Sequence, residues 1–271
     1  MNDLLRSKAP ITSEGWEQVD DEARRTLKVL LAARRLVDFV GPQGWAASAI
    51  SLGRTRVLSP SLQEGVESGV RLVQPLMEIR VPFTVARAEL EAIGRGATDP
   101  DLNPVRNAAR AAAVAEDRAI FQGYTAAGIE GIFAASAHQQ LVIPDKFEAY
   151  PDVVAEAVNR LRREGVSGPY AIALGPRCYT GLTSTTARGY PVIDHVKQLV
   201  DGPIVSAPAA DGAVVLSLRG GDFELTVGQD FSVGYLDHDS ACVQLYLQES
   251  FTFRVISPEA AVPLVYPAAA R

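Results

Sequence analysis

The sequence is poor in the residues that build disulfide frameworks and metal sites. Its 271 residues contain two cysteines, Cys178 and Cys242, and three histidines, His138, His195 and His238. Two cysteines cannot cross-link a disulfide-dense fold, so a reducing cytoplasm is the expected environment. The histidines are far apart, and none has a helical partner histidine or a neighbouring CxxC. We therefore predict no metal site.

Long apolar runs are also missing. No stretch approaches the roughly 20 apolar residues that span a bilayer. The first eight residues contain no apolar segment of the length that a secretory signal needs. We therefore expect neither a membrane partner nor secretion.

Positive charge is in deficit. The chain has 26 basic and 32 acidic residues, which gives a formal net charge of −6. Nucleic-acid binders usually carry a surplus of Lys and Arg, because release of phosphate counterions drives their affinity. The paired arginines lie within helical patterns, where a solvated helix face accounts for them. We predict no nucleic-acid partner.

Sequence signatures of catalysis are absent. There is no GxSxG nucleophile elbow, and Cys178 has no neighbouring histidine. Gly94-Arg95-Gly96 lacks the third glycine of a dinucleotide fingerprint, and Arg219-Gly220-Gly221-Asp222 is typical of a hairpin turn. These absences predict that the chain is not an enzyme and has no cofactor.

The pattern that is present begins with an amphipathic helix over residues 13–36, followed by a break at Gly41-Pro42-Gln43-Gly44. Residues 49–75 show no regular spacing of hydrophobic residues. Such a stretch suits an extended hairpin arm whose partners lie outside its own domain. Residues 77–85 alternate as a strand does, but Pro75 and Pro82 argue against a central position in a sheet. An alanine-rich helix from Pro104 to about Phe121 is expected to lie buried against a sheet.

Helices and short strands then follow without regular alternation, which indicates an α+β domain. The clearest strand runs from Val243 to Val255, with its apolar residues on one parity and Glu249 as the single polar intruder. At about twice the usual length, it predicts a long, curved sheet. For Glu116-Asp117, on the alanine-rich helix, we expect a structural ion pair rather than acid–base chemistry.

Several segments, taken in order, resemble those of encapsulins. They are Gly41-Pro42-Gln43-Gly44-Trp45, Glu116-Asp117-Arg118-Ala119-Ile120-Phe121-Gln122-Gly123, Gly128-Ile129-Glu130-Gly131, Gly168-Pro169-Tyr170, Arg219-Gly220-Gly221-Asp222-Phe223, Gly228-Gln229-Asp230-Phe231-Ser232-Val233-Gly234-Tyr235 and Leu247-Gln248-Glu249-Ser250-Phe251-Thr252-Phe253. The resemblance covers nearly the whole chain and is greatest to the compact, type 1 actinobacterial shells, once labelled linocin or bacteriocin-like.

The resemblance implies the tailed-bacteriophage major-capsid-protein fold, with peripheral and axial domains and an extended E-loop. The implied division gives residues 1–48 to the N-terminal helix and first part of the peripheral domain, and 49–76 to the E-loop. Residues 77–130 would complete the peripheral domain with its spine helix, 131–226 would form the axial domain, and 227–271 would return to the peripheral domain.

The function implied is that of a self-assembling shell protein. About 60 copies would close into an icosahedral (T=1) cytoplasmic nanocompartment. The shell would enclose a cargo protein, a dye-decolorising peroxidase or second a ferritin-like protein, through the cargo's C-terminal targeting peptide. A phage or prophage major capsid protein is the alternative, and a hydrolase or secreted bacteriocin is a third hypothesis.

The resemblance also implies two sites. The groove for the targeting peptide would involve Arg34, Asp38, Phe39, Asp230, Phe231, Val233 and Tyr235; the alternative for Phe231, Val233 and Phe39 is plain core packing. A pore at the five-fold axis would be lined by Thr183, Ser184, Thr185, Thr186, Ala187, Arg188, Gly189 and Tyr190, and the alternative is a solvated loop. That loop has no carboxylate, so cation selection is not expected. Ala88 stands where some encapsulins carry a flavin-stacking tryptophan, so we predict no flavin binding.

Overall fold

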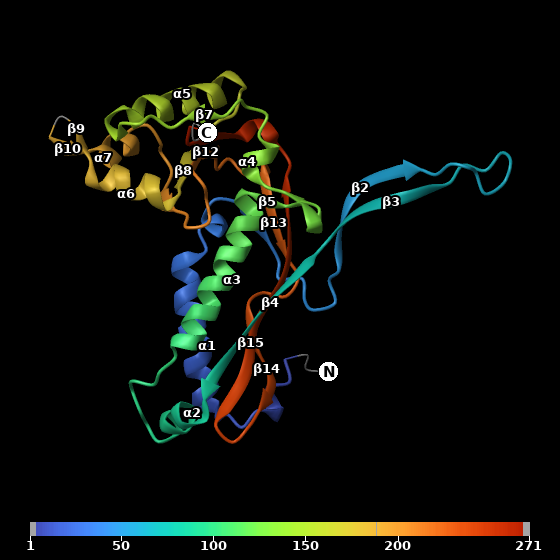
Figure 1. The fold of residues 1–271 in the computed structure, drawn as a ribbon. Helices are drawn as coiled ribbons and strands as arrows, with labels where there is room; N and C mark the ends of the chain where they lie inside the picture. Colours follow the sequence, from blue (N-terminus) through green and yellow to red (C-terminus); the bar gives the residue numbers. More distant parts are fainter. Residues whose placement is uncertain (1–3, 188, 268–271) are drawn as a thin grey trace.

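The computed structural model describes residues 4–187 and 189–267. Figure 1 shows three parts: an elongated body, a head at one end of it and a thin arm that projects sideways. The body contains the helices α1 (Ser13–Leu30), α2 (Arg87–Gly94) and α3 (Asn103–Phe121). Its strands form one sheet, the spine sheet, made of β1 (Asp38–Val40), β4 (Met77–Ala86), β13 (Phe223–Val227), β14 (Ser232–His238) and β15 (Cys242–Val255).

Strand β15 is the axis of the spine sheet. β4 runs antiparallel along one edge of β15, and β13 and β14 run in succession along the other. In the part of the chain that the structure describes, β4 pairs with β15 alone, so Pro82 lies on an edge strand, as predicted from the proline. The alternating apolar residues of β15 are buried, so this strand connects the core of the body with that of the head.

The alanine-rich helix α3 packs on the spine sheet through β4 and β15. Ala108, Ala109, Ala112 and Ala113 are all buried. Small side chains at these positions let the helix backbone lie close to the strands, and α1 packs along the same helix. The predicted burial of this helix against a sheet is confirmed.

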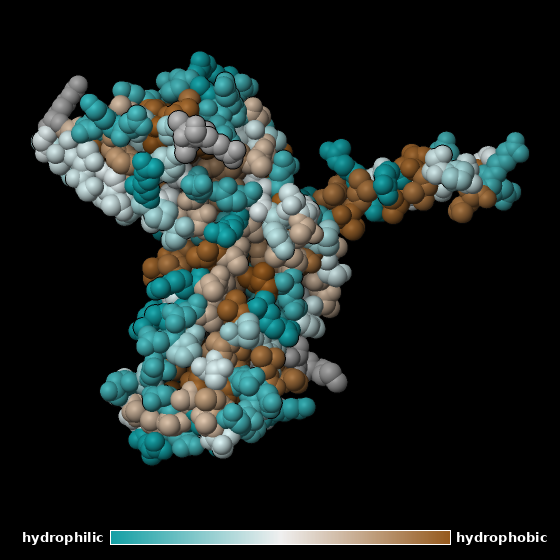
Figure 2. Space-filling model, viewed as in Figure 1, coloured by the Kyte–Doolittle hydropathy of each residue, from teal (hydrophilic) through white to brown (hydrophobic). Residues whose placement is uncertain are grey.

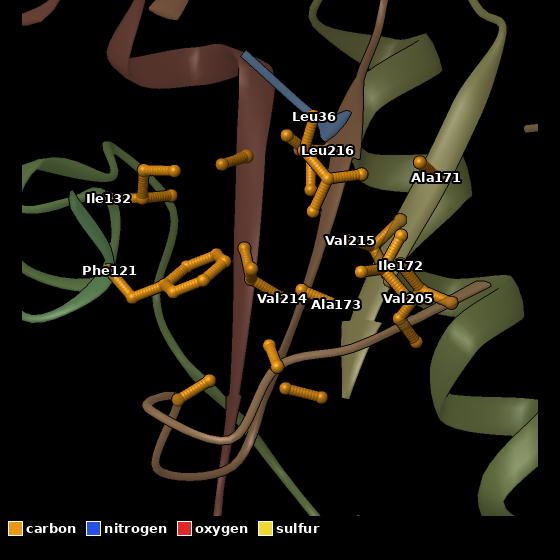
Figure 3. Packing of buried hydrophobic residues seen from close by; sticks show 14 of the residues in the cluster. Leu36, Phe121, Ile132, Ala171, Ile172, Ala173, Val205, Val214, Val215 and Leu216 are labelled. Atoms are coloured by element: carbon orange, nitrogen blue, oxygen red, sulfur yellow. The ribbon is translucent and has the colours of Figure 1, made fainter. Parts of the chain in front are cut away.

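The head is built on a second sheet, the head sheet, in the order β11-β8-β12-β16-β7. The strands are β7 (Leu141–Val142), β8 (Tyr170–Leu174), β11 (Ile204–Ser206), β12 (Ala213–Ser217) and β16 (Ala261–Val265). The helices α4 (Ile132–Ala135), α5 (Tyr150–Arg163), α6 (Pro176–Ser184) and α7 (Val192–Lys197) belong to the same part. Figure 3 shows aliphatic side chains of β8, β11 and β12 packing near Leu36, Phe121 and Ile132, which join head to body.

Two strands lie on the other side of the domain boundaries expected from the resemblance. β13, counted with residues 131–226, pairs with β15 in the spine sheet. β16, counted with residues 227–271, pairs with β12 and β7 in the head sheet. Ala261–Leu264 are buried, and a buried strand needs hydrogen-bonded neighbours for its backbone. The chain therefore passes from the spine sheet, at the end of β15, into the head sheet at β16.

The arm consists of β2 (Ala49–Val57), β3 (Gly69–Pro75) and the connecting residues 58–68 that form its tip. Within the described residues, β2 and β3 pair only with each other. Most of its residues are exposed. In Figure 1 the hairpin extends away from both sheets, and in Figure 2 it carries hydrophobic patches along its length. The remaining short elements are β5 (Gly123–Tyr124), β6 (Ile129–Glu130), β9 (Thr186–Ala187) and β10 (Tyr190–Pro191).

Candidate functional site

A groove of about 480 Å³ lies between the second half of α1 and the start of β14. Helix α1 supplies Ala23 and Leu27, and Leu31 follows at the same four-residue spacing, which places the three on one helix face. The rest of the lining comprises Leu4, Arg6, Asp20, Arg24, Lys28, Arg34, Asp230, Phe231, Ser232, Val233 and Leu247. The groove therefore has apolar walls and a charged rim, which suits an extended apolar segment with a few polar groups.

Arg34 is the central polar group of the groove. Its Nε lies 3.0 Å from both carboxylate oxygens of Glu116, and its Nη2 lies 2.6 Å from Glu116 Oε2. Nη1 donates to Asp230 Oδ1 at 2.9 Å, and Nη2 also donates to Glu249 Oε1. Glu116 and Glu249 are fully buried, whereas the Asp230 side chain is 43% exposed. The guanidinium thus joins the buried interior to the groove surface.

Burial shifts the titration of this cluster. Burial opposes the charged guanidinium, but hydrogen bonds and attraction from Glu116, Glu249 and Asp230 outweigh it and raise the pKa of Arg34. Burial is also the largest cause that raises the pKa of Glu249 well above its usual range, and the neighbouring Glu116 adds to this shift. Arg34 is therefore a permanent cation, while Glu249 resists ionisation.

Asp117 determines where Arg34 lies. Its two carboxylate oxygens accept hydrogen bonds from the backbone N–H groups of Ala32 (3.0 Å) and Ala33 (2.9 Å). These bonds satisfy the N–H groups at the start of a single turn of 3₁₀ helix, Ala33–Arg35. The first helix therefore ends at Leu30, short of the predicted residue 36, and the turn directs Arg34 to Glu116. The predicted structural role of Glu116-Asp117 is confirmed.

Two aromatic rings flank the guanidinium of Arg34. Its central carbon lies 5.1 Å from the ring centroid of Phe39 and 5.1 Å from that of Phe231. Contacts of this length between a guanidinium and an aromatic ring are favourable. Phe39 is 39% exposed, and Phe231 is partly buried. Arg34, Phe39, Asp230 and Phe231, far apart in sequence, therefore meet at one place.

The other residues predicted for the groove lie in different surroundings. Val233 lines the groove and also belongs to the buried core of the body. Its position is therefore compatible both with a place in the groove and with plain core packing. Asp38 does not line the groove, because its Oδ2 accepts a hydrogen bond from the N–H of Gly221 (2.6 Å) in a separate hollow. Tyr235 is buried, and its backbone N–H donates to Leu4 O at 2.9 Å. Tyr235 therefore positions a wall of the groove, and a direct part for Asp38 or Tyr235 in binding stays a prediction.

Glu249 is an unusual residue in the sequence, but it was not among the residues predicted for the groove. It was the one polar side chain on the apolar face of the long strand, and it lies beneath Arg34. Leu4 and Arg6 were not expected at the groove either. Arg6 is bonded to Asp20 at 2.7 Å and lies over the ring of Trp16, contacts that join the N-terminal segment to α1.

The loop predicted to line a pore lies at the end of the head farthest from the arm in Figure 1. Thr183 and Ser184 end α6, and their hydroxyls donate to helix carbonyls. Thr186 and Ala187 pair with Pro191 and Tyr190 in a small hairpin, whereas Arg188 lies outside the described residues. Among the described residues, no group of His, Cys, Asp and Glu is arranged to hold a metal ion.

Comparison with known proteins decides the family. The family model described as "Encapsulating protein for peroxidase" matches residues 1–252. A type 1 encapsulin shell protein of Rhodospirillum rubrum is 55% identical over 97% of this chain and 96% of its own length. The chain belongs to the encapsulin shell-protein family. A second encapsulin, from Mycolicibacterium paratuberculosis, is 48% identical over 97% of this chain and 99% of its own length.

Solved structures confirm the predicted capsid fold. The virus-like particle from Pyrococcus furiosus has a TM-score of 0.64 and 15% identity, and the match covers 91% of this chain and 98% of that one. The capsid of an empty GTA particle has a TM-score of 0.55 at 12% identity, covering 88% and 90%. This encapsulin thus has the α+β architecture of viral capsid proteins, and its relatives are named shell proteins rather than enzymes. In the described part of the chain, no helix is both long and apolar enough to cross a bilayer.

Proposed function

We propose that the chain is the repeating subunit of a closed icosahedral shell of about 60 copies, which encloses a cargo protein captured by its C-terminal targeting peptide. The β2–β3 arm is the observation that carries the assembly part of this proposal. An isolated two-stranded hairpin is at best marginally stable in water. This arm nevertheless exposes Val57 (77%) and Leu62 (87%), together with Leu58, Val66 and Val73.

A neighbouring copy is the partner that would cover these apolar side chains. No other described strand pairs with the outer edges of β2 and β3, so another chain can complete them. In a closed assembly every copy supplies one arm and receives another, so no arm is left exposed. The shell and virus-like-particle names of the relatives and structural neighbours support this interpretation.

Substitution Leu62→Asp tests the assembly proposal. A charge at this exposed tip position leaves the fold of the body unchanged, but it would be buried without a partner in the interface. We expect light scattering to detect large particles for the wild type and only small species for Leu62→Asp. Leu62→Met is the matched control and retains assembly. Particles of unchanged size and yield from Leu62→Asp would contradict a role of the arm tip.

The cargo part of the proposal rests on the groove beside α1. Its apolar lining offers pockets for alternate side chains of an extended peptide, and Arg34 and Asp230 offer polar groups that fix the register. The description of the matching family supports a peroxidase as cargo, with a ferritin-like protein as the second candidate.

Cargo loading is measured in two steps. Mass spectrometry of shells purified from the source organism first identifies the enclosed protein, and its C-terminal tail is then fused to a fluorescent reporter. The tagged reporter is expected to co-purify with wild-type shells. Phe231→Asp should reduce loading by about tenfold or more, because a charge replaces an aromatic contact, whereas Phe231→Leu should keep most of it. Equal loading of wild-type, Phe231→Asp and Phe231→Leu shells would contradict the assignment of this groove to cargo binding.

Two further assignments belong to the same proposal. The loop of residues 183–190 would line a pore where five copies meet. Its side chains include several hydroxyls and Arg188 but no carboxylate, so the pore would lack the acidic ring that selects cations. The phage-capsid alternative rests on structural neighbours at 10–15% identity, which carry the fold alone, while the encapsulin relatives reach 55%. Nuclease-resistant nucleic acid in purified particles would favour the capsid alternative.

A further inference from the structure

Beneath the groove, two buried carboxyl groups, those of Glu116 and Glu249, face a single guanidinium, that of Arg34. Glu249 interrupts the apolar face of β15, and its side chain is fully buried. Its Oε1 accepts a hydrogen bond from Arg34, whereas its Oε2 is buried without a hydrogen-bond partner among the described residues. A fully ionised carboxylate with one unpaired oxygen in this position would pay a large desolvation cost.

The groups that face Glu249 come from four elements. The 3₁₀ turn contributes Arg34, α3 contributes Glu116, with Asp117 directed at the backbone, and the segment before β14 contributes Asp230. β4 contributes the apolar Ile79 opposite Glu249 in the sheet. Three carboxyl groups thus share one guanidinium, and two of the three have no access to water.

The geometry distinguishes the two buried acids. Glu116 accepts three hydrogen bonds from Arg34, with both oxygens engaged, which is the arrangement of a carboxylate with a guanidinium. Glu249 accepts one. Burial and the charge of the neighbouring Glu116 both raise the pKa of Glu249, and Glu249 is the acid with an unpaired oxygen. The proton belongs on Glu249.

We propose that Glu249 acts as a neutral, proton-bearing positioning residue, which fixes Arg34 on Glu116 and thereby holds Phe39 and Phe231 in the arrangement that receives the targeting peptide. The inference rests on the proposed cargo function and deepens it. Without this contact, Arg34 keeps its ion pairs with Glu116 and Asp230, but Nη2 loses one of its two carboxyl acceptors and the guanidinium is held less firmly. The two rings would then lose the fixed cation between them.

A matched pair of amide substitutions tests the inference. In Glu249→Gln the amide reproduces a neutral carboxyl, since its oxygen can accept from Arg34 and it carries no charge, so loading of the tagged reporter should stay within about twofold of wild type. Glu116→Gln removes the carboxylate that forms the ion pair with Arg34, so loading should fall by about tenfold or more. The opposite order, or equal effects of both substitutions, would overturn the assignment.

The dependence of reporter loading on pH is a second measurement, and a purely structural role of Glu249 would leave it unchanged. Wild-type shells should lose bound reporter when the pH rises through the raised pKa of Glu249, while Glu249→Gln shells should retain it at the same pH. Identical profiles would overturn the inference. Phe231→Asp distinguishes failure of the proposed groove from failure of this inference. Normal loading of Phe231→Asp shells would contradict the groove itself. Loss of loading in Phe231→Asp with normal loading in Glu116→Gln would refute only the role of the buried pair.

Discussion

Single side chains decide where the groove lies. Asp117 on α3 binds two backbone N–H groups after α1, and its neighbour Glu116 binds the guanidinium that follows them. Local sequence indicated a helix through residue 36, because periodicity carries no information about a carboxylate that is more than 80 residues away. The resemblance to encapsulins named Arg34, but the contacts that hold it became visible only in the structure.

Asp117 should also make stability depend on pH. Burial raises its pKa from 3.8 to about 7, against the hydrogen bonds from Ala33 and Ala32. A raised pKa in the folded state stabilises the fold at low pH, and this contribution is lost as the pH rises through the folded pKa. The stability of wild type relative to Asp117→Asn should therefore fall between about pH 4 and about pH 7, by up to about 1.4 kcal/mol per pH unit.

Chemical unfolding of wild type and Asp117→Asn over this range measures the difference directly. The comparison cancels the titration of carboxyl groups common to both proteins. A difference that is flat with pH, or that grows toward neutral pH, would contradict the raised pKa and indicate that the two backbone hydrogen bonds keep Asp117 ionised.

At the scale of elements, periodic and long segments were predictable and short, tertiary ones were not. The alanine-rich helix, the strand of residues 77–85 and the long strand β15 lie where their patterns indicated. The two-residue strands β5, β6 and β7 are too short to carry a pattern of their own. Pairing alone defines them: β5 pairs with the nearby β6, and β7 pairs with the distant β16. The same holds for β13 and β16, whose assignment to a sheet depends on long-range hydrogen bonds.

One close approach within the spine sheet can be tested at this scale. A Cβ added at Gly234 in β14 would lie 2.2 Å from the ring of Tyr246, its register partner in the neighbouring strand β15. Arg80 covers this ring. Gly234→Ala should therefore destabilise the chain by about 1 to 3 kcal/mol.

Gly94→Ala is the matched control for this substitution. A Cβ there lies 3.7 Å from Thr12, an ordinary contact, at the end of α2, where alanine favours the helix. We expect Gly94→Ala to be neutral or slightly stabilising in the same unfolding measurement. Equal stability of the two variants would show that β14 and Tyr246 move apart at little cost.

At the scale of the whole molecule, the shape argues for assembly. The body and the head are joined by one continuous core, yet the arm leaves that core and keeps its apolar side chains in solvent. A monomer would gain nothing from this arrangement, because exposed strand edges and apolar patches favour aggregation. Residues 49–75 gave the earliest indication, since a sequence stretch without a period cannot be buried by its own domain.

The mass of the purified recombinant particle is the most direct test of the central claim. We predict hollow particles of about 1.7 MDa, which corresponds to about 60 chains of 29.0 kDa. Native mass spectrometry with electron microscopy measures the mass and the hollow interior on one sample. A monomer, dimer or open filament at micromolar concentration in near-physiological buffer would contradict the account.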